Sequence, residues 1–166
     1  MKKLAAIYFI ASIFLGCKPR VDDRFDDKLW KGTITLPDQQ VSMDFDFKES
    51  IFQPLVCKIS IPQQSIFELQ ASQITSSGDS LRIEFKDKMV ASYCAKIEKD
   101  YMTGEWRQGG YTFPLNLKKS NSTIYQSYVE YAISLARQKA LNADLVNWEK
   151  VREHAIQTSA NITSVA

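Results

Sequence analysis

His154 is the only histidine in this chain of 166 residues, so a Ser/His/Asp or Cys/His catalytic arrangement would have to be built around it. It follows Arg152 and Glu153 in a stretch whose apolar residues have helical spacing. The sequence contains no Gly-x-Ser-x-Gly nucleophile elbow that would supply a serine partner. We therefore interpret His154 as a surface residue of a helix, and we identify no catalytic residue in the chain.

The other reactive or ligating side chains are also poorly placed for chemistry. Cys57 and Cys94, together with one histidine, have no metal-ligand spacing, so the sequence predicts no metal site and no cofactor. The two cysteines could pair in an oxidising compartment, but strand alternation puts them on opposite faces, which makes a disulfide geometrically awkward. Asp44, Asp46 and Glu84 fall at polar-face positions, and we interpret them as solvated charges.

Cys17 is the one residue for which the sequence predicts a modification. Lys2 and Lys3 form a basic region, Leu4 to Leu15 is apolar, and Gly16 supplies a small residue directly before Cys17. This order is typical of a secretory signal peptide, and Phe14 to Cys17 resembles a bacterial lipobox. We expect a lipoprotein signal peptide over residues 1–16 and a diacylglyceryl group on Cys17, which would anchor the chain to a membrane. Ordinary secretion or a retained anchor stays open as the alternative.

Residues 17–28 form a charged tether after this cysteine. The segment from Lys18 to Lys28 is rich in Asp, Lys and Arg, and we interpret it as a solvated spacer rather than a metal site. Lys18 directly after the cysteine is typical of transfer to the outer membrane, so we expect a bacterial cell envelope location. Without Lys2 and Lys3 the chain has 19 basic and 19 acidic residues, a balance that gives no case for nucleic-acid binding.

Residues 29–118 have the alternating pattern of half-buried strands. Turn residues separate the apolar series, which run over 30–36, 41–47, 55–61, 81–85, 89–97, 102–106 and 111–117, with a less regular stretch at 64–75. About eight strands at this spacing predict an antiparallel meander that forms a small barrel or a sandwich. Closure is the favoured outcome because it removes exposed edges.

The last hairpin of this domain, Tyr101 to Leu117, reverses at Gln108-Gly109-Gly110. Pro114 cannot donate to a ladder and predicts an edge or bulged position. Several aromatic residues share the apolar faces of the strands, and we interpret them as core or as the lining of an apolar ligand pocket; they are Trp30, Phe45, Phe47, Phe85, Tyr93, Trp106 and Phe113.

Residues 122–166 change to the spacing of α-helices. A Ser/Asn/Ser run at 120–122 can cap a first helix, Asn142-Ala143-Asp144 interrupts the pattern, and Asn147 is placed to cap a second helix. The fold class is therefore mainly β, with two C-terminal α-helices.

The β-domain contains a series of motifs in a fixed order. Residues 29–118 resemble the N-terminal β-domain of secreted bacterial α/β-hydrolases and some peptidases in Trp30-Lys31-Gly32, Ser60-Ile61-Pro62-Gln63-Gln64, Ala91-Ser92-Tyr93, Gly104 to Gly110 and Phe113-Pro114-Leu115. The resemblance implies an accessory domain that carries no catalytic residue.

The helical segment has a second resemblance, to the helical start of tail-specific (C-terminal-processing) serine peptidases. The resemblance runs over Ala132-Ile133, Ala140 and Val146 to Arg152. Within it, Val146 to Arg152 is similar to that family's Val-Asp-Trp-x-x-Leu-Arg signature, with Asn147 in place of the Asp. The family's catalytic Ser and Lys lie in a domain beyond this segment, so the resemblance implies a chain that looks truncated before the catalytic domain.

Two functional hypotheses follow. The first is a non-catalytic, lipid-anchored relative of a periplasmic serine peptidase, whose helices pack on a catalytic domain or another envelope protein. The second is a self-contained lipoprotein whose barrel binds a small apolar ligand or a protein partner. In the first case Tyr128, Leu135, Trp148 and Val151 stay partly exposed; in the second they cover a face or mouth of the barrel.

Overall fold

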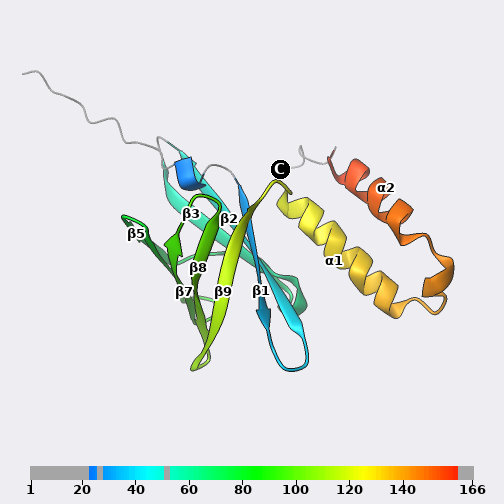
Figure 1. Cartoon of the computed structure of the whole chain (residues 1–166), viewed down its shortest axis with the longest axis horizontal. Helices are drawn as coiled ribbons and strands as arrows, with labels where there is room; N and C mark the ends of the chain where they lie inside the picture. Colours follow the sequence, from blue (N-terminus) through cyan, green and yellow to red (C-terminus); the bar gives the residue numbers. More distant parts are fainter. Residues whose placement is uncertain (1–22, 26–27, 51–52, 161–166) are drawn as a thin grey trace, which may run out of the picture.

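The computed structural model describes residues 23–25, 28–50 and 53–160. Within these described ranges, nine strands and two α-helices follow one another (Figure 1). Short 3-10 turns lie at Asp23–Phe25 (η1), Pro62–Gln64 (η2) and Ala143–Leu145 (η3). The strands and helices are β1 (Leu29–Thr35), β2 (Gln40–Ser50), β3 (Gln53–Ile61), β4 (Ile66–Gln70), β5 (Gln73–Ser77), β6 (Ser80–Phe85), β7 (Ala91–Ile97), β8 (Tyr101–Gln108), β9 (Tyr111–Ser120), α1 (Ile124–Lys139) and α2 (Trp148–Ala160).

The predicted antiparallel meander is confirmed. The strands form one curled, half-barrel sheet in the order β4-β3-β2-β1-β9-β8-β7-β6-β5. The irregular stretch at 64–75 becomes two strands, β4 and β5, and β7 begins at Ala91 rather than at Met89. β4 and β5 form the opposite edges of the sheet, although only Ala71 and Ser72 separate them in sequence. Ala71 N–H donates to the Cys57 carbonyl and Ser72 N–H to that of Glu84, so the chain itself links the two edges.

The concave side of the sheet holds a core rich in aromatic rings. The ring of Phe45 lies 5.2 Å from that of Tyr93 and 6.3 Å from that of Trp106, centroid to centroid. The Tyr93 hydroxyl donates to the Leu115 carbonyl at 3.1 Å, which satisfies a polar atom in an apolar interior. Six of the seven aromatic residues singled out in the sequence are at most 1% exposed, and they are Trp30, Phe45, Phe47, Phe85, Tyr93 and Trp106. The seventh, Phe113, is half-buried against this core.

β1 and β9 pair over only part of their length. Their ladder joins Leu29–Gly32 to Leu117–Ser120, and no pairing extends beyond Gly32 and Leu117. Gly32 is required where they meet, because a Cβ at this position would lie 2.6 Å from the Asn116 carbonyl oxygen. β9 is an inner strand, but at Pro114 it pairs only with β8 and has no partner on its β1 side, so the predicted edge or bulged position is confirmed as a local edge. The proline is tolerated because it lies past the end of the β1 ladder and needs to donate no hydrogen bond there.

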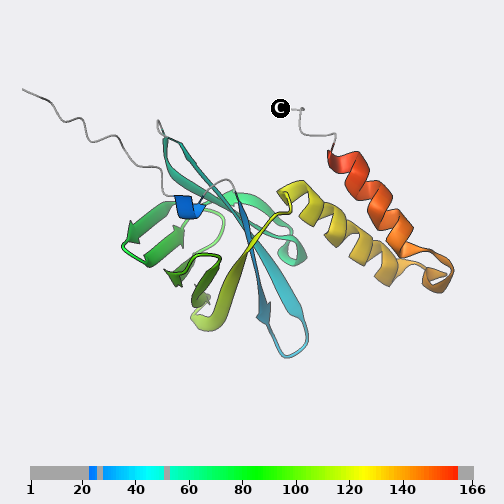
Figure 2. The same cartoon turned by 45° about the horizontal axis from the view of Figure 1, so that its top comes forward.

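The helices form an antiparallel hairpin that projects from one side of the sheet (Figures 1 and 2). Thr123 caps α1 in a capping box with Gln126, one residue after the predicted Ser/Asn/Ser run. The Asn147 side chain accepts from Lys150 N–H at 3.0 Å and so caps α2, as the sequence predicts. Arg152 on α2 pairs with Glu130 on α1 at 2.6 Å, an ion pair between the two helices. We call this hairpin, residues 124–160, the helical arm.

Candidate functional site

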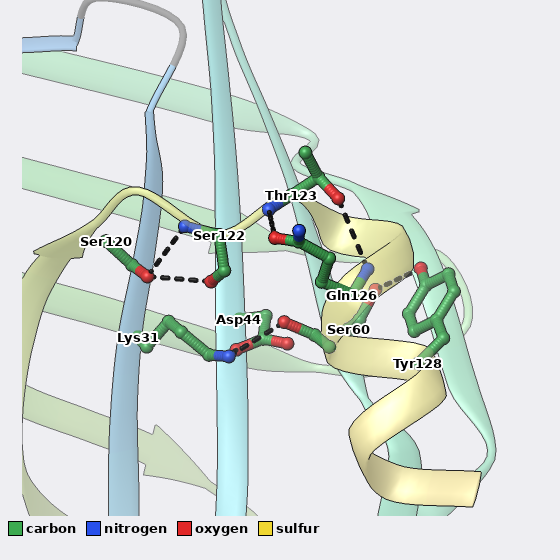
Figure 3. A network of polar contacts seen from close by, with 9 residues as sticks. Lys31, Asp44, Ser60, Ser120, Ser122, Thr123, Gln126 and Tyr128 are labelled. Atoms are coloured by element: carbon green, nitrogen blue, oxygen red, sulfur yellow. Dashed lines mark hydrogen bonds and ion pairs between the residues drawn. The ribbon is translucent and has the colours of Figure 1, made fainter. Parts of the chain in front are cut away.

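The first turns of α1 contact the outer face of β1, β2 and β3 through polar side chains (Figure 3). The residues that meet there are Lys31, Asp44, Ser60, Ser127 and Tyr128, which we call the junction cluster. Lys31, Asp44 and Ser60 come from successive strands, and strand alternation directs all three away from the apolar core. Ser127 and Tyr128 are adjacent on α1, and each bonds a different strand.

Lys31, Asp44 and Ser127 form the more buried half of the cluster. The Lys31 ammonium donates to Ser127 Oγ at 2.8 Å and lies 3.9 Å from the Asp44 carboxylate. Asp44 is 4% exposed and Ser127 is 5% exposed. Interpreting Asp44 as a solvated charge is therefore wrong, because α1 covers this position of the sheet. Burial raises the pKa of Asp44, and the nearby Lys31 charge and the hydrogen bond with Ser127 only partly oppose this effect.

Ser60 and Tyr128 form the second half of the cluster. Their hydroxyl groups are 2.9 Å apart, and Ser60 Oγ also accepts from the Glu68 N–H at 3.0 Å. The Tyr128 ring meets Phe67 edge-on, with centroids 5.3 Å apart. Burial raises the pKa of the Tyr128 hydroxyl, which favours its neutral form, the form that can donate a hydrogen bond. The cluster thus attaches α1 to the sheet by hydrogen bonds and one aromatic contact.

A cavity of about 230 Å³ lies beside the junction cluster, lined in part by Lys31, Asp44 and Ser127. Because Ser127 lies next to Lys31, a catalytic pair of a serine nucleophile and a lysine base has to be considered. A general base must accept the serine proton, whereas here the Lys31 ammonium donates to Ser127 Oγ beside a carboxylate. The arrangement is that of a structural attachment, and we assign no catalytic role to it.

The structure does not bring together the residues whose side chains could act as nucleophiles, bases or metal ligands. His154 is exposed on α2, as the sequence predicts. Cys57 is buried in the core and Cys94 is half-buried on the outer face, and both are free thiols. Across the described part of the chain, no group of three His, Cys, Asp or Glu side chains could hold a metal ion. Cys17, the signal peptide and most of the tether lie outside the described residues.

Exposed apolar side chains are concentrated on the helical arm. Among the described residues, six of the ten large hydrophobic side chains that are well exposed belong to it or to its connecting loop: Tyr125, Leu135, Leu141, Leu145, Val146 and Val151. Leu135 and Val151 are 41% and 40% exposed. Trp148 is half-buried, and its indole N–H donates to the Ala143 carbonyl at 2.7 Å. Four residues discriminate the two hypotheses: Tyr128, Leu135, Trp148 and Val151. Tyr128 contacts the β-domain through Ser60 and Phe67.

Comparison with protein-family models, curated proteins and solved structures finds no match to this chain. The two resemblances seen in the sequence therefore stay predictions. No helix among the described residues is long and apolar enough to cross a membrane.

Proposed function

We propose that this protein is a lipid-anchored, non-catalytic protein of the bacterial cell envelope, whose helical arm binds a serine peptidase catalytic domain. One observation carries the proposal: the arm projects from the β-domain and keeps apolar side chains such as Leu135 and Val151 about 40% exposed. Apolar side chains grouped on one element, rather than scattered over the surface, are typical of an interaction site.

The way in which the arm is attached supports this role. The junction cluster fixes the first turns of α1 to the sheet, with Ser127 5% exposed, while the rest of the arm extends away from the strands (Figure 2). An arm held at one end presents its remaining surface in a defined direction. The resemblance of residues 132–152 to the helical start of tail-specific peptidases favours a peptidase domain as the partner.

The anchor is the second part of the proposal and rests on Gly16-Cys17. A diacylglyceryl group on Cys17 would hold the protein at a membrane surface, and the charged residues 18–28 would separate the β-domain from it. In this account the β-domain is a rigid support between the lipid and the arm.

Photo-cross-linking from the arm tests the proposal in the cells that make the protein. A photoreactive residue at Leu135 should cross-link to one protein that a serine-directed phosphonate probe also labels. The matched control is the same residue at Arg137, which is exposed and points about 200° away around α1. Equal cross-linking from both positions would reject the exposed apolar side chain of Leu135 as part of the binding site. A partner that the phosphonate does not label would reject the peptidase assignment.

A further inference from the structure

The β1–β2 and β8–β9 hairpins turn at the same end of the β-domain (Figure 1). Side chains of these hairpins line a small pocket there. The pocket lies beyond the last pair of the β1–β9 ladder, Gly32 with Leu117, where the two strands are no longer paired. Beyond that point Ile34 pairs with Val41 in one hairpin, and Trp106 pairs with Phe113 in the other. These four side chains line the pocket. We call it the mouth pocket.

The mouth pocket lies at the end of the core, and most of its wall is formed by core residues, namely Ile34, Val41, Met43, Ile61 and Trp106. Its volume is about 190 Å³, the share of roughly six water molecules in the liquid. Pockets for drug-sized molecules start near about 300 Å³, so only a smaller molecule fits. The sequence analysis interpreted seven aromatic residues as core or as the lining of an apolar pocket. Two of them, Trp106 and Phe113, form part of the wall of the mouth pocket.

The polar side chains of the mouth pocket include two glutamine amides, and none of the described residues that line it is charged. The Trp106 indole N–H donates to Gln108 Oε1 at 3.0 Å. Because an indole N–H can only donate, this bond fixes the oxygen of the Gln108 amide toward Trp106 and leaves its NH₂ group as a donor. Gln64, on η2, supplies the other amide. A ligand in the mouth pocket would therefore meet an apolar wall and an amide donor.

We propose that the mouth pocket binds a small, neutral, apolar molecule that carries one hydrogen-bond acceptor, such as an aryl or alkyl alcohol or carbonyl compound. A carboxylate fits less well, because moving its charge out of water has a high cost where no cation lines the site. A pure hydrocarbon fits the wall but leaves the Gln108 NH₂ group without the ligand bond. The site lies on the β-domain and does not depend on the partner proposed for the arm.

The test compares toluene, benzyl alcohol and benzoate, which share one ring and differ in the polar group. Residues 18–166, which contain every described residue, are titrated with each probe and followed by ¹⁵N-resolved NMR. Benzyl alcohol should give saturable shifts centred on the Trp106 indole N–H, and toluene should bind about fivefold more weakly, the factor expected for one net hydrogen bond. Benzoate should not saturate over the same concentrations.

One variant and one control test the location of the site. Leu36→Trp places a large ring at a half-buried position of the pocket lining and should abolish saturable binding. Leu55→Trp makes the same change at a half-buried leucine outside the pocket and should leave it unchanged. Shifts that do not saturate, that survive Leu36→Trp, or that show no preference for benzyl alcohol over toluene would overturn the proposal.

Discussion

Asp44 is a carboxylate held beneath α1 with the Lys31 ammonium beside it, and this placement makes the stability of the protein depend on pH. Its pKa is raised above the ordinary value of 3.8, since burial outweighs the attraction of Lys31 and the hydrogen bond with Ser127. A carboxyl group with a raised pKa holds its proton more tightly in the folded chain. Its contribution to stability therefore falls as pH rises from about 3.8 to above the folded pKa.

Asp44→Asn should remove this pH dependence while keeping a polar group next to Ser127. We expect the free energy of unfolding of the wild type, minus that of the variant, to fall as pH rises through this window and to be constant above it. Denaturant unfolding at a series of pH values measures the difference. Asp46, whose pKa burial also raises, is present in both proteins and cancels to first order. A difference that rises with pH, or does not change, would contradict the assignment.

Trp106 is 1% exposed and contacts Phe45 and Phe85 through its ring. Trp106→Ala should lower the free energy of unfolding by about 3–5 kcal/mol, the range for removing a large buried ring. Tyr111→Ala is the control, because Tyr111 is an aromatic residue of the adjoining strand that is 70% exposed, and it should change stability by only about 0.5 kcal/mol. Similar losses in both variants would show that Trp106 is not a core residue.

The helical arm is the element whose side chains should tolerate polar substitution in the isolated chain. Leu135→Ser and Val151→Ser should each change the free energy of unfolding by only about 0.5 kcal/mol, since both residues are about 40% exposed. Tyr128→Phe should cost about 0.5–1.5 kcal/mol, because it removes the hydroxyl bonded to Ser60. A larger loss from the serine variants than from Tyr128→Phe would mean that the arm packs on the β-domain.

Alternation of apolar and polar residues was sufficient to predict the strands and the meander. In a half-buried strand, the polarity of each residue indicates whether its side chain lies on the buried or the exposed face. It was insufficient at 64–75. There Ser65 and Glu68 have positive φ values of 55° and 50°, a backbone geometry that side-chain patterns do not encode. The Asn147 cap was predictable because capping is local. The Thr123 cap was predicted only approximately, within the neighbouring run.

The junction cluster could not be predicted from the sequence, for a different reason. Asp44 alternates with core residues like any outward-facing strand residue, and no residue near it in the sequence indicates that a helix packs over it. The residue that buries it, Ser127, is separated from Asp44 by seven strands and belongs to α1. Which face a helix covers depends on packing between distant segments, so the local pattern of β2 predicted a solvated charge where the structure has a buried one.

At the scale of the whole molecule, the anchor on Cys17 stays a prediction with a direct test. Cys17→Ser should abolish incorporation of labelled fatty acid and move the protein from the membrane fraction to the soluble fraction, because a serine hydroxyl does not accept the lipid. Cys94→Ser is the control, since this half-buried thiol should not affect lipidation. A wild-type N-terminal peptide without acyl mass would contradict the prediction.

We propose that the β-domain is a self-sufficient support and that the arm is an attached binding element. Chemical denaturation of residues 18–166 beside residues 18–120 distinguishes this arrangement from a single folding unit. The shorter chain should keep a cooperative transition with most of the stability of the longer one, because its core lies wholly within residues 25–117. If the shorter chain loses most of its stability, the helices belong to the β-domain, and a self-contained binding protein becomes the better account.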